Sequence, residues 1–279
     1  MSLKDILVHF DAGPHAATRL AVAVDLARRQ HAHLIGLYVT IPVSAPDALP
    51  SGVDSVLLET WSQRFREQNE LDMQGVEATF TEALRREGLT GEWRVAEGPL
   101  PETIALHTRY ADLAIIGQTN PDRPDTAVFN EIIEEVLFSS GRPVLMVPYA
   151  GTFEAIGRNV LVGWKSTAEA ARALNDAIPL MRGAEQITIM TSDPANGDGD
   201  EPVADIALHL ARHGLKVLAA HTISDGLRGD DILLNQAADT GADLLVMGAY
   251  GHSRMRERML GGVTRGILQS ATIPVLLSR

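Results

Sequence analysis

The sequence predicts an α/β protein made of two repeated, doubly wound domains, each a five-stranded parallel sheet sandwiched by helices. Three observations predict it. Short apolar runs alternate with longer amphipathic stretches along the 279 residues. The short runs are apolar on both faces, which is typical of strands in a parallel sheet that helices cover on both sides. The same order of segments also occurs twice.

The repeat is clearest in the last two strands of each copy. The segment 111–117 matches 242–248 and the segment 142–147 matches 273–278, both at a shift of 131 positions. Near the start of each copy, 4–8 matches 158–162 at a shift of 154. The second copy is therefore shorter than the first between its first and fourth strands.

The elements follow in the same order in both copies. In the first copy we expect strands at 6–10, 33–40, 93–96, 113–117 and 144–148. Amphipathic stretches between them predict helices at 16–30, 54–86, 100–110 and 129–139. In the second copy we expect strands at 159–163, 186–191, 216–221, 244–248 and 274–278, with a short helical stretch near 202–213 replacing the long one.

The domain boundaries follow from the repeat. We expect one domain over residues 1–150 and a second over 157–279, joined by a short linker at 149–157 that contains two glycines. We expect each copy to keep its own sheet, not to share one continuous sheet. Asp112 should superpose on Asp243 and Pro143 on Pro274.

Composition narrows the function. The net charge of −12 argues against sequence-independent nucleic-acid binding. The chain has no cysteine, which excludes disulfides and thiol catalysis and fits a cytoplasmic location. We expect no membrane span and no secretory signal. The histidines near the first strand lack metal-ligand spacing, and no catalytic triad is evident, so we predict neither a metal site nor a catalytic residue.

A glycine-rich loop follows the fourth strand of the second copy. Gly248 and Gly251 end the strand, and Gly261 and Gly262 open the next helix. Glycines let backbone N–H groups approach a phosphate, and a helix N-terminus attracts anions. Thr264 adds a hydroxyl in the first turn. The arginines of this region, Arg254, Arg256, Arg258 and Arg265, make it the basic neighbourhood of an acidic protein.

The spacing of these glycines, G-x-x-G followed by nine residues and a third glycine, resembles the nucleotide-binding loop of universal stress proteins. With the repeat, the resemblance covers nearly the whole chain and implies the adenine nucleotide α-hydrolase-like fold. It implies ribose and phosphate contacts at Gly248 and Gly251 and a phosphate cradle over 261–264. The family usually has Ser or Thr where this sequence has Gly262. The candidate nucleotide-binding residues are Trp164, Lys165, Thr191, Gly248, Gly251, His252, Gly261, Gly262, Val263 and Thr264.

Each copy departs from the family pattern in a different place. An aspartate ends the first strand in the family, and the first copy has it as Asp11, but the second has Lys165 after Trp164. The first copy has instead lost the loop, because Asn120, Asn130 and Glu131 replace its glycines. Carboxylates in a helix's first turn repel phosphate. We therefore predict that the first copy binds no nucleotide and that only the second retains a site. There Lys165 contacts phosphate and Trp164 stacks on a base, or else Lys165 is a surface residue and Trp164 a packed one.

The resemblance implies a cytoplasmic stress-response protein, a regulatory binding module and not an enzyme, whose C-terminal half binds ATP or a related adenine nucleotide with accompanying Mg²⁺. Two alternatives stay open. One is an interaction protein with both sites lost, and the other is an adenylyl-transferring enzyme. Weak ATPase activity is compatible with the first interpretation. The expected partners are a second copy of the chain, through the same fold, and a protein that the sequence does not identify.

Overall fold

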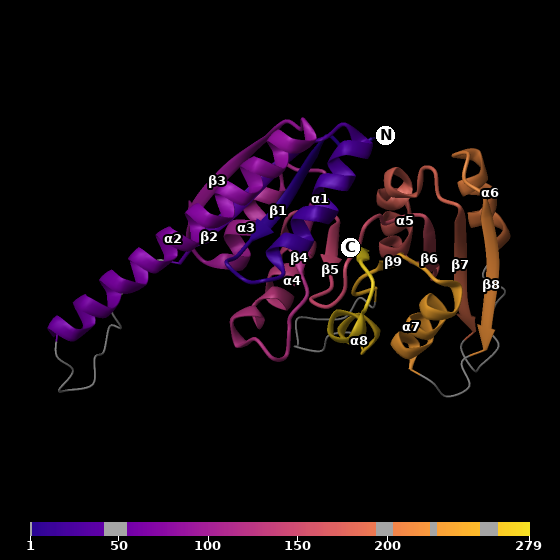
Figure 1. Cartoon of the computed structure of the whole chain (residues 1–279). Helices are drawn as coiled ribbons and strands as arrows, with labels where there is room; N and C mark the ends of the chain where they lie inside the picture. Colours follow the sequence, from indigo (N-terminus) through magenta and orange to yellow (C-terminus); the bar gives the residue numbers. More distant parts are fainter. Residues whose placement is uncertain (1, 42–54, 194–202, 224–227, 252–261) are drawn as a thin grey trace.

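The computed structural model of the chain describes residues 2–41, 55–193, 203–223, 228–251 and 262–279. The strands of the first half are β1 (Asp5–Phe10), β2 (His33–Thr40), β3 (Gly91–Glu97), β4 (Leu113–Gly117) and β5 (Val144–Val147). Its helices are α1 (Ala16–Gln30), α2 (Ser55–Glu87), α3 (Leu100–Thr108) and α4 (Phe129–Ser139), with a 3-10 turn at Pro124–Thr126. Figure 1 shows these elements in indigo to magenta.

The second half repeats this order. Its strands are β6 (Asn159–Gly163), β7 (Gln186–Asp193), β8 (Val217–Ile223), β9 (Leu244–Gly248) and β10 (Val275–Ser278). Its helices are α5 (Ala168–Met181), α6 (Val203–Arg212), α7 (Gly229–Thr240) and α8 (Gly262–Ser270). The strand order is β3-β2-β1-β4-β5 in one half and β8-β7-β6-β9-β10 in the other, all parallel within each half. The predicted fold class, two doubly wound parallel domains, is confirmed.

The strand registers reproduce the shifts found in the sequence. Ala114 pairs with Val144 across β4 and β5, and Leu245 pairs with Val275 across β9 and β10, each 131 positions later. The equivalent aspartates, Asp112 and Asp243, also make equivalent hydrogen bonds. Asp112 accepts the backbone N–H of Lys4 at 2.7 Å, and Asp243 accepts that of Gly157 at 2.6 Å. Each carboxylate thus ties the chain that enters the first strand to the start of the fourth.

The expectation of two separate sheets was wrong. β5 and β10 pair antiparallel, so that the strands form one ten-stranded sheet. Leu145 pairs with Leu276, and these are the same position of the repeat, 131 residues apart. The contact is therefore self-complementary, like the interface of a two-fold symmetric dimer. Pairing removes two exposed strand edges, which otherwise leave backbone N–H and C=O groups unpaired.

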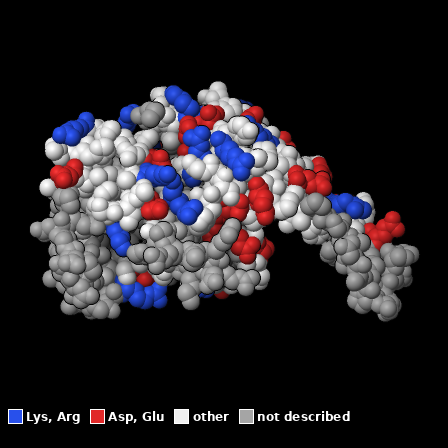
Figure 2. Space-filling model, turned by 180° about the vertical axis from the view of Figure 1, so that it is seen from behind, with Lys and Arg blue, Asp and Glu red and all other residues white. Residues whose placement is uncertain are grey.

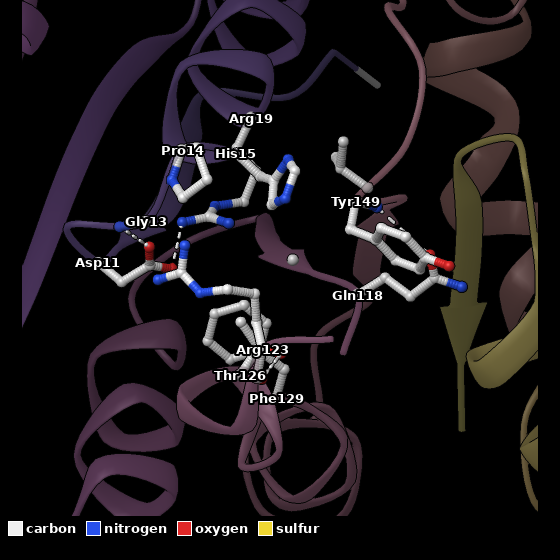
Figure 3. Close-up of a pocket in the computed structure, with 12 residues that line it drawn as sticks. Asp11, Gly13, Pro14, His15, Arg19, Gln118, Arg123, Thr126, Phe129 and Tyr149 are labelled. Carbon is white, nitrogen blue, oxygen red and sulfur yellow. Dashed lines mark hydrogen bonds and ion pairs between the residues drawn. The ribbon is translucent and has the colours of Figure 1, made fainter. Parts of the chain in front are cut away.

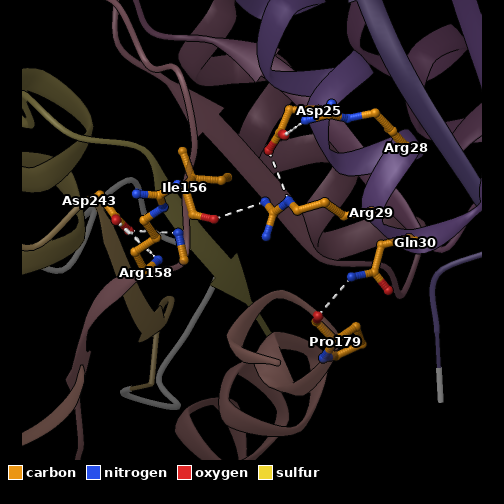
Figure 4. A network of polar contacts seen from close by, with 9 residues as sticks. Asp25, Arg28, Arg29, Gln30, Ile156, Arg158, Pro179 and Asp243 are labelled. Atoms are coloured by element: carbon orange, nitrogen blue, oxygen red, sulfur yellow. Dashed lines mark hydrogen bonds and ion pairs between the residues drawn. The ribbon is translucent and has the colours of Figure 1, made fainter. Parts of the chain in front are cut away.

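The hydrophobic core forms two layers that run through both halves. One face of the sheet is covered by α1, α2, α5 and α6, and the other by α3, α4, α7 and α8. Polar contacts add to the junction (Figure 4). Arg29 donates to the Ile156 carbonyl and Gln30 to the Pro179 carbonyl, both at 2.8 Å. In the described ranges every helix is too short or too polar to span a bilayer.

Helix α2 departs from this compact plan, because its N-terminal part projects from the sheet (Figures 1 and 2). Among its described side chains, Phe80 and Ala83 of the C-terminal part are buried in the core. Along this helix, side-chain hydrogen bonds of 2.8 Å join residues four apart, Gln63 with Glu67 and Gln68 with Asp72. Such pairs support a helix that has little tertiary contact.

Candidate functional site in the second half

The candidate site lies where β6 and β9 end. These neighbouring parallel strands end at the same edge of the sheet, and the helices α5 and α8 that follow them pack on opposite faces. A crevice between diverging loops at the carboxyl ends of strands is where doubly wound folds bind ligands. Two helix N-termini therefore converge on the residues that follow β9.

Two of the predicted glycines differ in what the fold demands of them. A Cβ on Gly248 would stand 2.5 Å from the Ala170 nitrogen, so glycine is needed there to seat β9 on the start of α5. A Cβ on Gly251 would lie 3.4 Å from Glu169 Oε2 and 3.5 Å from Thr167 Oγ1, which are ordinary contacts. Packing therefore explains Gly248 and does not explain Gly251.

The start of α8 is open on one side and anchored on the other. Among the described residues, a Cβ on Gly262 would meet nothing within 4 Å, and Val263 is 36% exposed. Thr264 is instead buried, and its hydroxyl oxygen accepts a long hydrogen bond of 3.5 Å from the Tyr250 N–H. That hydroxyl keeps its own hydrogen for a second acceptor. His252 and Gly261 lie outside the described residues.

The remaining predicted residues sit at the ends of β6 and β7. Trp164 is half-buried against the core, and its backbone N–H donates to the Met190 carbonyl at 2.8 Å. Thr191, the next residue of β7, is 6% exposed. Lys165 is exposed. Trp164 and Thr191 thus lie at the ends of two neighbouring strands, β6 and β7.

Sequence reasoning missed two neighbours of the glycines. Glu169 brings a carboxylate to Gly251, in the first turn of a helix that Thr167 caps by accepting the Ala170 N–H at 3.3 Å. Tyr250 is one of the non-glycine residues with positive φ, at 58°. Glu169 could have been found from the sequence, because it stands two positions after the helix cap Thr167. Nothing local predicted the conformation of Tyr250.

The equivalent place in the first half is filled by the protein's own side chains (Figure 3). Arg19, 2% exposed, forms an ion pair of 2.5 Å with Asp11, donates to the His9 carbonyl at 3.2 Å and lies over the Phe129 ring. The Gly117 Cα faces this guanidinium closely. The cavity that remains measures about 10 Å³, room for one water molecule.

Burial also sets the protonation of the groups around Arg19. The pKa of His9 falls from 6.5 to about 4, mainly through burial and then through the charge of Arg19, although Asp11 opposes the shift. His9 is therefore neutral at pH 7, and its Nδ1 makes no hydrogen bond within the described structure. Among the residues that the structure describes, no three His, Asp or Glu side chains group as a metal site.

The fold and this site define a tandem α/β protein with a glycine loop at the strand ends of its second half. The sequence model of the Universal stress protein family matches residues 2–148 and 158–279. The chain therefore belongs to the Universal stress protein family, with two copies of its domain.

Individual relatives agree with the family. The universal stress protein Slr1230 of a Synechocystis species is 26% identical over 60% of this chain and 58% of its own length. The Bacillus subtilis universal stress protein YxiE is 30% identical over 28% of this chain and 60% of its own length. The matches thus span about three fifths of each of these relatives.

Solved structures share the fold at low identity. A universal stress protein from Archaeoglobus fulgidus superposes with a TM-score of 0.70 at 17% identity, over 99% of this chain and 96% of its own. A universal stress protein in complex with cAMP aligns with 53% of this chain and 98% of its own at 15% identity, with a TM-score of 0.37. Binding of cAMP is a property of that protein.

Proposed function

We propose that the C-terminal half binds an adenine nucleotide, ATP or a related one, and that the protein is a cytoplasmic stress-response binding module, not an enzyme. The observation that carries the proposal is Gly251, beside the N-termini of α5 and α8. It is not among the glycines with positive φ, and among the described residues a Cβ on it meets no close contact. The fold does not need glycine at this position, whereas a phosphate that approaches the backbone does.

Electrostatics supports an anion at this place. The N-termini of α5 and α8 carry partial positive charge from their unpaired N–H groups. Two exposed basic residues lie close in sequence to these N-termini, Lys165 before α5 and Arg265 in the first turn of α8. The Thr264 hydroxyl, which accepts from Tyr250, can donate its hydrogen to a phosphate oxygen. We expect Mg²⁺ to arrive with the nucleotide, held by its phosphates.

The internal comparison supports binding in one half only. At the shift of 154, Arg19 of α1 corresponds to Ala173 of α5, which is buried and small. The second half therefore lacks the side chain that fills the first-half site. In the first half, Glu131 lies in the first turn of α4 and adds negative charge where a phosphate would bind.

One observation favours the alternative of an interaction module without nucleotide. The Glu169 carboxylate beside Gly251 repels a phosphate that approaches the same backbone. Adenylyl transfer finds no support in the described residues, and we do not propose it.

Calorimetric titration of ATP with Mg²⁺ tests the proposal. Gly251→Val should reduce affinity more than about tenfold, because the side chain occupies the phosphate approach. Gly262→Ser should raise affinity about fivefold, since one hydrogen bond contributes about 1 kcal/mol. Gly75→Val is the matched control, because Gly75 lies on α2 with open space around it. No heat from the wild type up to millimolar ATP, and none from Gly262→Ser, would leave the interaction module as the better explanation.

A further inference from the structure

The glycine loop of the second half rests on a helix of the first. The Tyr250 ring lies 5.1 Å from the ring of Phe138, on α4, at an interplanar angle of 48°. The Tyr250 hydroxyl is buried without a hydrogen bond of standard geometry, within electrostatic reach of Glu134 of the same helix. Tyr250 thus connects a loop of one half to the surface of the other.

Tyr250 needs such a support because of its backbone. It lies between Gly248 and Gly251 at φ 58°, in the left-handed region that a residue with a Cβ rarely adopts. Such a conformation persists where the surroundings fix it. Two contacts of the described residues hold it, the ring packing on Phe138 and the N–H bond to Thr264.

The first half also holds the other end of α8. The Gln118 amide, 2% exposed, donates to the carbonyls of Leu268 at 3.2 Å and Ala271 at 3.1 Å, which are among the unpaired carbonyls that end the helix. The repeat places Ala249 at the position equivalent to Gln118, so the second half has no counterpart of this contact. In Figure 1, α8 accordingly lies in the middle of the molecule, between the two halves.

We propose that α4 is a positioning platform for the nucleotide site of the second half: Phe138 holds the Tyr250 ring and so holds the backbone of Gly248–Gly251 in the conformation that phosphates meet. This gives the first half a role in binding although it binds no nucleotide itself. Phe129, the first residue of α4, lines the first-half cavity, while the last turn of the helix supports the other site. The inference rests on the proposed function for its effect on affinity and on the ligand-free loop for its geometry.

Two arms of one experiment test the platform separately from nucleotide binding. In the first arm, amide hydrogen exchange is measured without ligand. Phe138→Ala should speed exchange severalfold in the peptide that contains Tyr250, and Phe138→Tyr should restore slow exchange. Arg279→Ala is the matched control, because Arg279 lies 3.8 Å above the same Phe138 ring and its loss leaves the Tyr250 contact intact. Equal exchange in Phe138→Ala and wild type overturns the platform whatever the ligand does.

In the second arm, ATP is titrated into the same variants. Phe138→Ala should weaken binding between about twofold and tenfold, the effect of losing one aromatic contact, while Arg279→Ala should not. ATP should also slow exchange over α4 in the wild type and not in Phe138→Ala. If the wild type binds no ATP, the proposed function fails and the first arm still decides the platform. If wild type and Phe138→Ala bind equally, the platform fails and the nucleotide site stands.

Discussion

Arg19 and Ala173 occupy the same position of the repeated helix and have opposite consequences. In α1 the guanidinium is buried against Asp11 and Phe129 and fills the space at the carboxyl ends of the strands. In α5 the buried alanine has no side chain that could make these contacts. A buried charge is tolerated only when it is paired and hydrogen-bonded, and Arg19 has both an ion pair and a carbonyl acceptor. The first half therefore maintains its closed site through specific contacts.

His9, beneath Arg19, predicts a pH dependence of stability. The unfolded chain binds its proton near pH 6.5, whereas the folded chain resists protonation until about pH 4. Between these values the unfolded state binds more protons, so the free energy of unfolding falls as the pH is lowered, by about 3 kcal/mol in total. Urea unfolding from pH 7 to pH 4 should show a shallower fall for His9→Leu than for the wild type. Parallel curves would mean that His9 titrates normally in the folded protein.

Glu169 predicts a gain of affinity. Its carboxylate lies beside Gly251, where it would repel a phosphate, and two like unit charges about 4 Å apart repel each other by roughly 1 to 4 kcal/mol between bulk water and a protein surface. Glu169→Gln should therefore tighten ATP binding several-fold at low salt and less at high salt. Glu131→Gln makes the same change in the first half and should have no effect. A weaker Glu169→Gln complex would show that the carboxylate helps binding, for example by capping α5.

At the scale of elements, α8 offers a matched pair of glycines. Gly266 faces Asp230 of α7 so closely that a Cβ would overlap the carboxylate, whereas Gly262 faces open space. Gly266→Ala should destabilise the fold by about 1–3 kcal/mol, the usual cost of overpacking. Gly262→Ala should be neutral or stabilise it by up to about 1 kcal/mol, because alanine favours the helix. Urea unfolding of both variants decides, and equal stabilities would indicate that α7 shifts freely.

The elements themselves could be predicted because their signals are local. Strands β4 and β9 and helices α1 and α4 begin and end where periodicity placed them. The contact between β5 and β10 could not be predicted, since a strand that is apolar on both faces has the same pattern at an edge and in the interior. Arg19 escaped notice for a related reason. Its burial depends on Asp11 and Phe129, and Phe129 is distant in sequence.

In the candidate site too, local patterns could be predicted from the sequence and long-range contacts could not. The glycine spacing singled out Gly248, Gly251 and Gly261 from sequence alone, and the structure gives Gly248 a packing role that spacing could not reveal. Whether these residues bind nucleotide stays a prediction. The contacts of Tyr250 with Phe138 and of Gln118 with α8 join residues more than 100 positions apart, beyond the reach of local patterns.

At the scale of the whole molecule, the fused sheet predicts cooperative unfolding. Leu145 and Leu276 pair at its centre, and both core layers run through the two halves. Separating the halves would expose this apolar surface and leave the backbone of two strands unpaired, so neither half should survive the unfolding of the other. The same pairing leaves β3 and β8 as the edges of the sheet. A second copy of the chain, if it binds, must therefore use a surface other than β5 and β10.

The tryptophans allow this cooperativity to be measured. Trp93 packs in an aromatic cluster of the first half with Phe10 and Phe80, and Trp164 packs on the core of the second. With Trp61 replaced by Phe, a further Trp164→Phe change leaves Trp93 to report on the first half, and Trp93→Phe leaves Trp164 to report on the second. Far-ultraviolet circular dichroism of each variant corrects for any change that the substitution makes to overall stability. Fluorescence and circular dichroism should give coincident urea midpoints in both variants. A fluorescence midpoint above the dichroism midpoint in one variant and below it in the other would mean that the halves unfold independently.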